Sequence, residues 1–82
     1  MTWRIRHTQT FYKELAKVPL PVRKRVEELA FGEAIKEDPF LQGKTQKLAG
    51  HREYYKIRFG NYRVGLRIST TEKIVEFRRI LH

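Results

Sequence analysis

The sequence predicts an α+β domain with the element order β-α-α-β-β-β, in which a two-helix hairpin packs on one face of a mainly antiparallel four-stranded sheet. Residues 54–59 and 62–68 alternate apolar and polar side chains, and Gly60-Asn61 between them supplies the turn of a β-hairpin. Upstream, apolar residues recur at helical spacing on both sides of Pro19-Leu20-Pro21. Because helices and strands come in separate blocks, we expect the helices to cover one sheet face.

The N-terminal segment is expected to form a strand and then a helix. Residues 2–7 alternate in polarity, which is typical of a half-buried strand. Thr8 or Thr10 can cap the helix that follows, because a threonine hydroxyl accepts a hydrogen bond from an unpaired backbone N–H at a helix start. The apolar stripe of this helix would consist of Phe11, Leu15 and Val18.

A second helix is expected to begin at Pro21. The first backbone N–H of a helix has no partner within the helix, so proline, which lacks an N–H, loses no hydrogen bond there. Asp38-Pro39 would end it. Its apolar stripe would comprise Val22, Val26, Leu29 and Ala30, with Phe31 as a further candidate. Residues 40–50 are expected to form a loop that Leu41 and Leu48 anchor.

The hairpin predicts two chemically different faces, because strand residues two apart point the same way. The apolar side comprises Tyr55, Ile57, Phe59, Tyr62, Val64, Leu66 and Ile68. The other side, which we call the open face, would carry Lys56, Arg58, Arg63 and Arg67, with Tyr54 among them. Gly65 leaves a shallow spot there, and Glu53 falls on the apolar parity. A solvated face usually mixes signs, so cations without a carboxylate favour a surface that binds phosphate.

The last strand, residues 73–82, is less informative. Either alternating set of its side chains can face inward, so the sequence leaves Arg78 and Arg79 unplaced. Among the histidines, His7 is expected to pack inward and His51 to be solvated in a loop. His82 is expected closest to the cations of the hairpin.

The composition indicates one small basic domain spanning residues 1–82. Lys and Arg number 18 against 9 Asp and Glu, a net charge of +9, which favours a polyanion or an acidic protein as partner. The chain has no cysteine, which excludes disulfides and thiol chemistry and suits the cytoplasm. No apolar run approaches the length of a membrane span, so no membrane partner is expected. No spacing of metal ligands is visible, so we expect chemistry without a metal or other cofactor.

Four short motifs occur in an order that resembles the RelE/ParE toxin superfamily. They are Leu48-Ala49-Gly50, Tyr55-Lys56-Ile57-Arg58, Gly60-Asn61-Tyr62-Arg63-Val64 and Arg79-Ile80-Leu81-His82. The element order is similar over essentially the whole chain. The resemblance implies a toxin that a cognate RelB-like antitoxin wraps and neutralises, in a hetero-oligomer whose two genes usually adjoin. RelE-like members cleave messenger RNA in the ribosomal A site, whereas ParE-like members inhibit DNA gyrase.

The resemblance favours the RelE-like branch, because Lys56, Arg58 and Arg63 match positions where RelE-like toxins carry catalytic Lys and Arg. We add Arg79 and His82 as catalytic candidates, and Tyr54 and Arg67 as candidates for RNA binding. RelE-like toxins usually continue past the last strand with another Arg and a Tyr tied to catalysis. The sequence here stops at His82, so either that tail lies beyond it or the chain is a weakened form.

The expected reaction is attack of a ribose 2′-OH on the adjacent phosphate of ribosome-bound mRNA. Arg58 and Arg63 would stabilise the phosphorane charge, since arginine is always protonated and forks onto phosphate oxygens. Lys56 would serve as base or electrostatic clamp, and His82 would assist proton transfer. Two alternatives stay open: a ParE-like gyrase inhibitor, and a degenerate toxin domain that binds RNA and antitoxin without catalysis.

Overall fold

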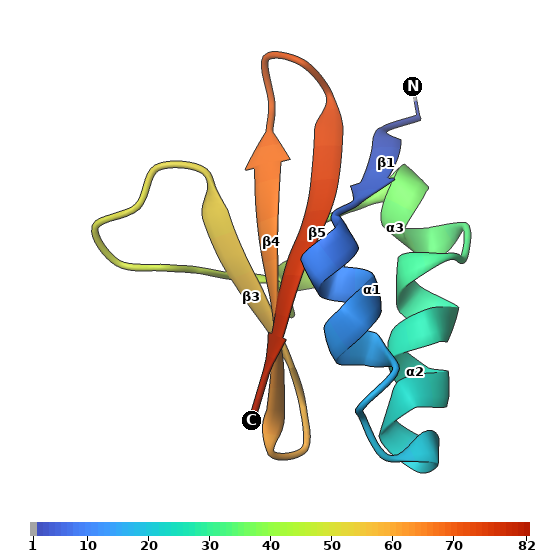
Figure 1. The fold of residues 1–82 in the computed structure, drawn as a ribbon. Coiled ribbons are helices and arrows are strands. Elements are labelled where there is room, and N and C mark those ends of the chain that lie inside the picture. Colours follow the sequence, from blue (N-terminus) through green and yellow to red (C-terminus); the bar gives the residue numbers. More distant parts are fainter. Residues whose placement is uncertain (1) are drawn as a thin grey trace.

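The computed structural model describes residues 2–82, which form two layers, a sheet and the helices packed on one of its faces (Figure 1). In chain order the elements are β1 (Arg4–His7), α1 (Gln9–Leu15), α2 (Leu20–Ala30), α3 (Ala34–Glu37), the 3₁₀ helix η1 (Leu41–Gly43), β2 (Gln46–Lys47), β3 (Tyr54–Phe59), β4 (Tyr62–Ser69) and β5 (Ile74–Leu81). The sheet has five strands in the order β1-β5-β4-β3-β2. β1 runs parallel to β5 and the other neighbours are antiparallel, so the predicted α+β class is confirmed.

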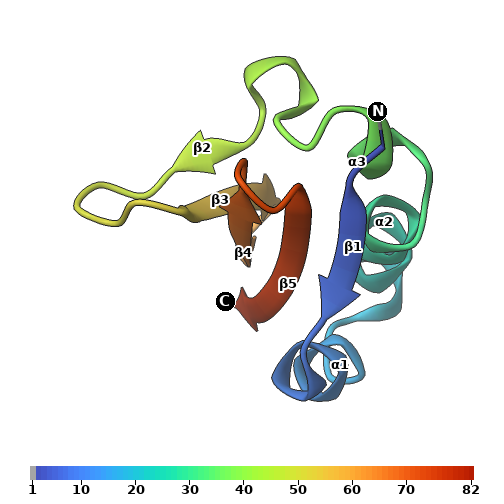
Figure 2. The same ribbon diagram turned by 90° about the horizontal axis from the view of Figure 1, so that it is seen from above.

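The helices of residues 2–82 all lie on one side of the sheet (Figures 1 and 2). The buried core lies between them and includes Phe11, Val26, Ile35, Val64, Val75 and Phe77. Ile57, Phe59 and Leu66 are buried in the same cluster, as the alternation of the hairpin predicts. None of the helices in residues 2–82 is long and apolar enough to cross a membrane.

The start of α1 follows one of the two predicted caps. Thr8 has extended backbone angles, and its Oγ1 accepts a hydrogen bond of 3.1 Å from Phe11 N. Thr10 lies inside the helix. α2 begins one residue before the predicted position, at Leu20, with Pro21 in its first turn.

The prediction that the second helix continues to Asp38 is wrong. α2 ends at Ala30, and the short α3 follows it after a turn at Gly32. A Cβ on Gly32 would lie 2.3 Å from the carbonyl oxygen of Glu28, so only glycine lets the chain turn this closely on the helix end. Phe31, a candidate for the apolar stripe, is instead 48% exposed because the helix has ended before it.

The predicted loop over residues 40–50 contains two short elements, η1 and β2. β2 pairs with β3 at two positions, Gln46 with Lys56 and Lys47 with Tyr55, and makes the fifth strand that the sequence did not predict. Both residues of β2 are exposed and polar, so they show no alternation from which a strand could be predicted.

A β-bulge between β4 and β5 determines which side chains reach the open face. Gly65 pairs with Arg79 and Leu66 with Phe77, which leaves Arg78 as the extra residue on β5. Phe77 and Ile80 are both buried, and the arginines between them are not. The bulge therefore directs two consecutive arginines away from the core.

Candidate functional site

A shallow hollow of about 390 Å³ opens at the hairpin end of the open face. Its lining residues are Lys56, Arg58, Gly60, Asn61, Arg63 and His82, and we call it the cationic pocket. They come from β3, from the hairpin turn, from β4 and from the residue that follows β5. The fold thus brings together five side chains with nitrogen donors, from β3, β4, the turn between them and the residue that follows β5.

The register of the sheet explains this convergence. Arg58 pairs with Arg63 across the hairpin, and Arg63 pairs with Leu81 of β5. His82 follows Leu81 directly and therefore reaches the same end of the face. Gly60 has φ +60°, a left-handed conformation that glycine adopts without steric cost, and it allows the tight turn between β3 and β4.

The cations of the pocket have no anionic partner in the described part of the chain. Residues 2–82 form ion pairs at Lys36, Arg67, Arg78 and Arg79, and none involves Lys56, Arg58 or Arg63. Arg58 and Arg63 are exposed and directly opposite each other, an unfavourable pairing of like charges. A bound phosphate would relieve this repulsion, because two guanidinium groups can share its oxygens.

His82 lies beside an aromatic ring at the edge of the pocket. Its ring centroid is 4.9 Å from that of Tyr62, with the two planes tilted by 55°. Tyr62 is half-buried against the core, so it provides a fixed neighbour for a terminal side chain.

Arg79 shares the open face with Lys56 but does not line the cationic pocket. Its Nε donates to both carboxylate oxygens of Glu14 at 3.1 Å, and its Nη2 lies 3.0 Å from Glu14 Oε2. Burial alone would raise the pKa of Glu14, but the hydrogen bonds from Arg79 and from Ile80 N, together with the charges of Arg79 and Lys17, lower it below its usual value. Through the same hydrogen bond and charge, Glu14 raises the pKa of Arg79. The pair holds Arg79 toward α1.

Arg67 is also engaged by carboxylates. Its Nε lies 3.2 Å from Glu53 Oε1, and its Nη2 lies 3.4 Å from Glu72 Oε1. Desolvation would lower the pKa of Arg67, but the charges of Glu53 and Glu72 raise it. The expectation that Glu53 stays with the apolar side is therefore wrong: Glu53 lies just before β3, where its side chain turns to Arg67. Of the predicted cations of the hairpin, Lys56, Arg58 and Arg63 thus keep an uncompensated charge, whereas Arg67 does not.

Tyr54 lies at the opposite end of the face from the hairpin turn and is 37% exposed. The guanidinium of Arg78 is 5.7 Å from its ring centroid, and the ring of His51 is 5.9 Å away. Arg78 Nη1 also donates to Glu76 Oε1 at 2.7 Å. Sequence reasoning left both Arg78 and Arg79 unplaced. A glycine inside a strand, such as Gly65, is a signal of a bulge that could have placed them.

The other histidines lie away from the pocket. His7 packs against aromatic rings, with centroid distances of 4.6 Å to Phe31 and 5.4 Å to Phe77, and its Nε2 lies 2.8 Å from Ala30 O. His51 is exposed before β3, as expected for a loop residue. Between residues 2 and 82, no group of three or more His, Cys, Asp or Glu side chains is placed to hold a metal ion.

No protein-family model matches the sequence. The chain is 37% identical over 78 residues to the toxin RelE3 of Methanocaldococcus jannaschii, an alignment that covers 90% of this chain and 83% of that protein. Its structure resembles a chain of the RelB–RelE antitoxin–toxin complex from Methanococcus jannaschii, with a TM-score of 0.77, 34% identity and coverage of 94% of this chain and 88% of the other. It also resembles a chain of the toxin–antitoxin complex RelBE2 from Mycobacterium tuberculosis, with a TM-score of 0.79, 28% identity and coverage of 100% and 99%. The chain therefore belongs to the RelE family of toxins.

Proposed function

We propose that this chain is the toxin of a toxin–antitoxin pair and acts in the cytoplasm as an endoribonuclease that cleaves messenger RNA on the ribosome. The observation that carries the proposal is the cationic pocket, in which Lys56, Arg58 and Arg63 have no carboxylate partner in residues 2–82 and His82 stands beside them. Its partners would be the ribosome with mRNA and ribosomal RNA, and a RelB-like antitoxin with which it forms a hetero-oligomer. The toxin itself would be a single domain over residues 1–82.

The reaction is a transesterification within the RNA. The 2′-oxygen of a ribose loses its proton and bonds to the adjacent phosphorus, and the bond from phosphorus to the 5′-oxygen of the next nucleotide breaks. The products are a 2′,3′-cyclic phosphate and a 5′-hydroxyl. The protein must remove one proton, stabilise the extra charge on the phosphorane and supply one proton to the leaving oxygen.

The pocket supplies groups for each task. Arg58 and Arg63 face each other across the hairpin, so the phosphorane oxygens can accept hydrogen bonds from both guanidinium groups at once. Lys56 lies in the next cross-strand row of the open face and lines the same pocket, where it would serve as base or as electrostatic clamp. His82 lines the same pocket, and in this proposal it would carry a proton to the leaving oxygen.

Cleavage mapping on translating ribosomes tests the proposal. The purified chain is added to ribosomes stalled on a defined mRNA, and the 3′ ends of the fragments are identified chemically. We expect cuts within the A-site codon, with 2′,3′-cyclic phosphate ends, and no cuts in the same mRNA without ribosomes. An intact message on ribosomes that bind the chain would contradict the nuclease and favour a toxin domain that binds without catalysis.

A further inference from the structure

The layer of side chains on the open face has a gap at Gly65, in the central strand β4. Beside this gap, Tyr54 of β3 and Arg78 of β5 contact each other, and we call them the Tyr54–Arg78 pair. We infer that one base of the RNA lies over Gly65 and stacks on the Tyr54–Arg78 pair, next to the phosphate in the cationic pocket. The inference rests on the proposed function, because it adds a base subsite to the phosphate site of that reaction.

The fold itself does not require glycine at position 65. The φ of Gly65 lies outside the left-handed region, unlike that of Gly60 in the hairpin turn, so a side chain would not strain the backbone. The extra residue of the β-bulge is Arg78 on β5 and not Gly65. A Cβ on Gly65 would lie 3.7 Å from Arg79 Cβ, an ordinary van der Waals distance. A glycine inside a strand is often found where a ligand approaches the backbone closely, and this explanation fits Gly65.

The two sides of the gap differ in charge. On the hairpin side lies Arg63, which lines the cationic pocket and has no carboxylate partner in residues 2–82. On the other side lies Arg67, which contacts Glu53 at 3.2 Å and Glu72 at 3.4 Å. Residues two apart in a strand are separated by about 7 Å, so Arg63 and the space over Gly65 lie within reach of one nucleotide. A phosphate bound on the hairpin side therefore brings an adjoining base over Gly65.

The Tyr54–Arg78 pair reaches across β4. Because β4 lies between β3 and β5, and the guanidinium of Arg78 is 5.7 Å from the ring centroid of Tyr54, the contact passes over the strand that carries Gly65. Arg78 Nη1 donates to Glu76 Oε1 at 2.7 Å, which holds the guanidinium in place. The ring centroid of His51 lies 5.9 Å from that of Tyr54 and supports it from the loop. Both members keep exposed surface, since Tyr54 is 37% exposed and the side chain of Arg78 is 43% exposed.

These surroundings fit a base better than a phosphate. Each arginine on this side of the gap, Arg67 and Arg78, already contacts a carboxylate, and the carboxylates would repel a phosphate. A base carries no charge, and its flat surface stacks on aromatic rings and on guanidinium planes. The open face thus offers phosphate contacts at the hairpin end and stacking contacts beyond Gly65.

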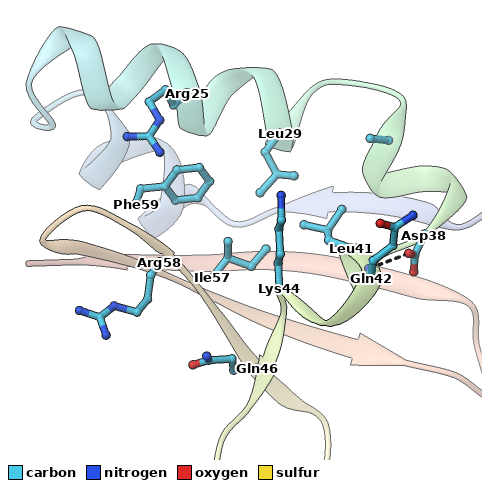
Figure 3. Close-up of a pocket in the computed structure, with 11 residues that line it drawn as sticks. Arg25, Leu29, Asp38, Leu41, Gln42, Lys44, Gln46, Ile57, Arg58 and Phe59 are labelled. Carbon is cyan, nitrogen blue, oxygen red and sulfur yellow. Dashed lines mark hydrogen bonds between the residues drawn. The ribbon is translucent and has the colours of Figure 1, made fainter.

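A second hollow, of about 750 Å³, offers an RNA strand less on the helix side of the sheet (Figure 3). It lies between α2, η1 and β3, and Arg58 lines both this hollow and the cationic pocket. Figure 3 shows Leu29, Leu41 and Ile57 converging on the space between helix and strand. A strand that left the cationic pocket in this direction would meet aliphatic side chains, and none of the described residues that line the hollow is an exposed aromatic. Stacking therefore favours the path over Gly65.

Binding of two matched strands tests the subsite. One is a short 2′-O-methylated oligoadenylate, which cannot be cut, and the other has the same length and phosphates but hydrogen in place of each base. Fluorescence anisotropy measures their affinities for the full chain at a series of salt concentrations. We expect Tyr54→Ala to lower the affinity for oligoadenylate by about tenfold, a typical loss for one stacked base. The affinity for the strand without bases and the salt slope should stay unchanged, because no phosphate contact is removed.

Two further variants separate stacking from charge and from a general loss of aromatic surface. Arg78→Lys keeps the charge but removes the planar guanidinium, so it should also weaken oligoadenylate binding and leave the salt slope unchanged. Tyr12→Ala is the matched control, because Tyr12 is an exposed tyrosine of α1, on the helix side of the sheet. It should bind both strands as the parent does.

Filling the gap tests the position of the base. Gly65→Ala and Gly65→Val place a small and a larger side chain over the backbone, so the affinity for oligoadenylate should fall in that order. The affinity for the strand without bases should stay at the parent's value. Valine is favoured in strands, and circular dichroism melting shows whether each variant folds. If Gly65→Val does not fold, Gly65→Ala carries the comparison, because its Cβ has room.

Three outcomes would overturn the inference. They are equal affinities of the parent for the two strands, equal losses for Tyr54→Ala and Tyr12→Ala, and a loss in Tyr54→Ala that is the same for both strands. None of these measurements needs a ribosome or a cut RNA. If the parent cleaves no mRNA but the strands separate as expected, the nuclease fails and the base subsite stands. If the parent cleaves mRNA but binds both strands equally, the nuclease stands and the base subsite fails.

Discussion

Arg58 and Arg63 differ from the other arginines of β3, β4 and β5 in their electrostatic surroundings. Arg67, Arg78 and Arg79 each contact a carboxylate at 3.4 Å or less, whereas Arg58 and Arg63 face each other without one in residues 2–82. A guanidinium already paired with a carboxylate must give up that partner to bind phosphate. Because Arg58 and Arg63 also line one pocket together, they are the strongest candidates for holding a scissile phosphate.

The first prediction concerns Arg63. Replacement by Ala should lower single-turnover cleavage by about two to three orders of magnitude, the usual loss when one strong donor to the transition state is removed. Arg63→Lys should recover only part of the rate, because an ammonium keeps the charge and loses the fork geometry. Ribosome affinity, measured in parallel, should change little.

Arg4→Ala provides a matched control, since Arg4 is exposed in β1 and lines neither hollow. It should cleave at the parent's rate. If Arg63→Ala did the same, the cationic pocket would not be the active site.

The sequence could place some of the candidate residues but not others, for a reason visible in the contacts. Strand alternation alone put Lys56, Arg58 and Arg63 on one face, and the register then brought them together with His82. The carboxylate that engages Arg79 lies 65 residues away in the sequence, on α1. No local sequence pattern predicts a contact between residues so far apart. The sequence alone therefore could not show that Arg79 lies outside the cationic pocket.

At the scale of elements, the C-terminal end of β5 depends on α1. β1 stops at His7, opposite Phe77, so the last residues of β5 have no strand on that side within the described chain. Side chains at the two ends of α1 take its place: Thr8 Oγ1 donates to Arg78 O at 2.9 Å, and Ile80 N donates to Glu14 Oε1 at 2.8 Å. These bonds protect an exposed strand edge and fix the segment that carries His82.

The second prediction follows from the pKa of Glu14, which lies below the ordinary value of 4.5 in the folded chain. A lowered folded pKa means that the charge of Glu14 stabilises the fold fully above its unfolded pKa and that this contribution is lost as pH falls through the folded pKa. Glu14→Gln should therefore lower the free energy of unfolding at neutral pH. Below about pH 4.5, the free energy of unfolding of this variant should fall less steeply with pH than that of the parent. Urea unfolding at a series of pH values measures this.

Glu28→Gln serves as the comparison for that series, because Glu28 is an exposed carboxylate of α2 outside the ion pairs of residues 2–82. It should unfold with the parent's pH dependence. Parallel curves for the parent and Glu14→Gln across the acid range would show that the Glu14–Arg79 pair contributes nothing to stability.

The third prediction concerns the turn that ends α2. Gly32→Ala should destabilise the fold by about 1–3 kcal/mol, because the new Cβ would lie 2.3 Å from the backbone oxygen of Glu28 and the backbone must move. Gly65→Ala is the matched substitution, since its Cβ would meet Arg79 Cβ at an ordinary 3.7 Å. Urea unfolding should separate the two; equal stabilities would mean that the α2–α3 turn adapts without cost.

For the whole molecule, periodicity predicted the class and the main layers, because both depend on where apolar side chains recur. The α+β order, the helices on one face and the buried alternation of Ile57, Phe59, Val64 and Leu66 are all confirmed. The fifth strand and the break of the second helix depend instead on single contacts, a two-residue pairing at β2 and one close approach at Gly32. Such contacts form only in the folded chain, and the local pattern of apolar and polar residues does not predict them.

The net charge of +9 makes salt dependence a test of how many cations hold RNA. For single-stranded RNA, log K falls against log[salt] with a slope of about −0.7 per phosphate neutralised. If RNA is held by the cations of the pocket, Lys56, Arg58 and Arg63, the slope should be about −2. Arg63→Ala should reduce the magnitude of this slope by about 0.7. Arg67→Ala should change the slope much less, because Glu53 and Glu72 already offset the charge of Arg67. Fluorescence anisotropy with a short 2′-O-methylated RNA, which cannot be cut, measures all three slopes. Equal reductions for the two variants would show that RNA spreads over the whole open face and displaces the carboxylates of Arg67.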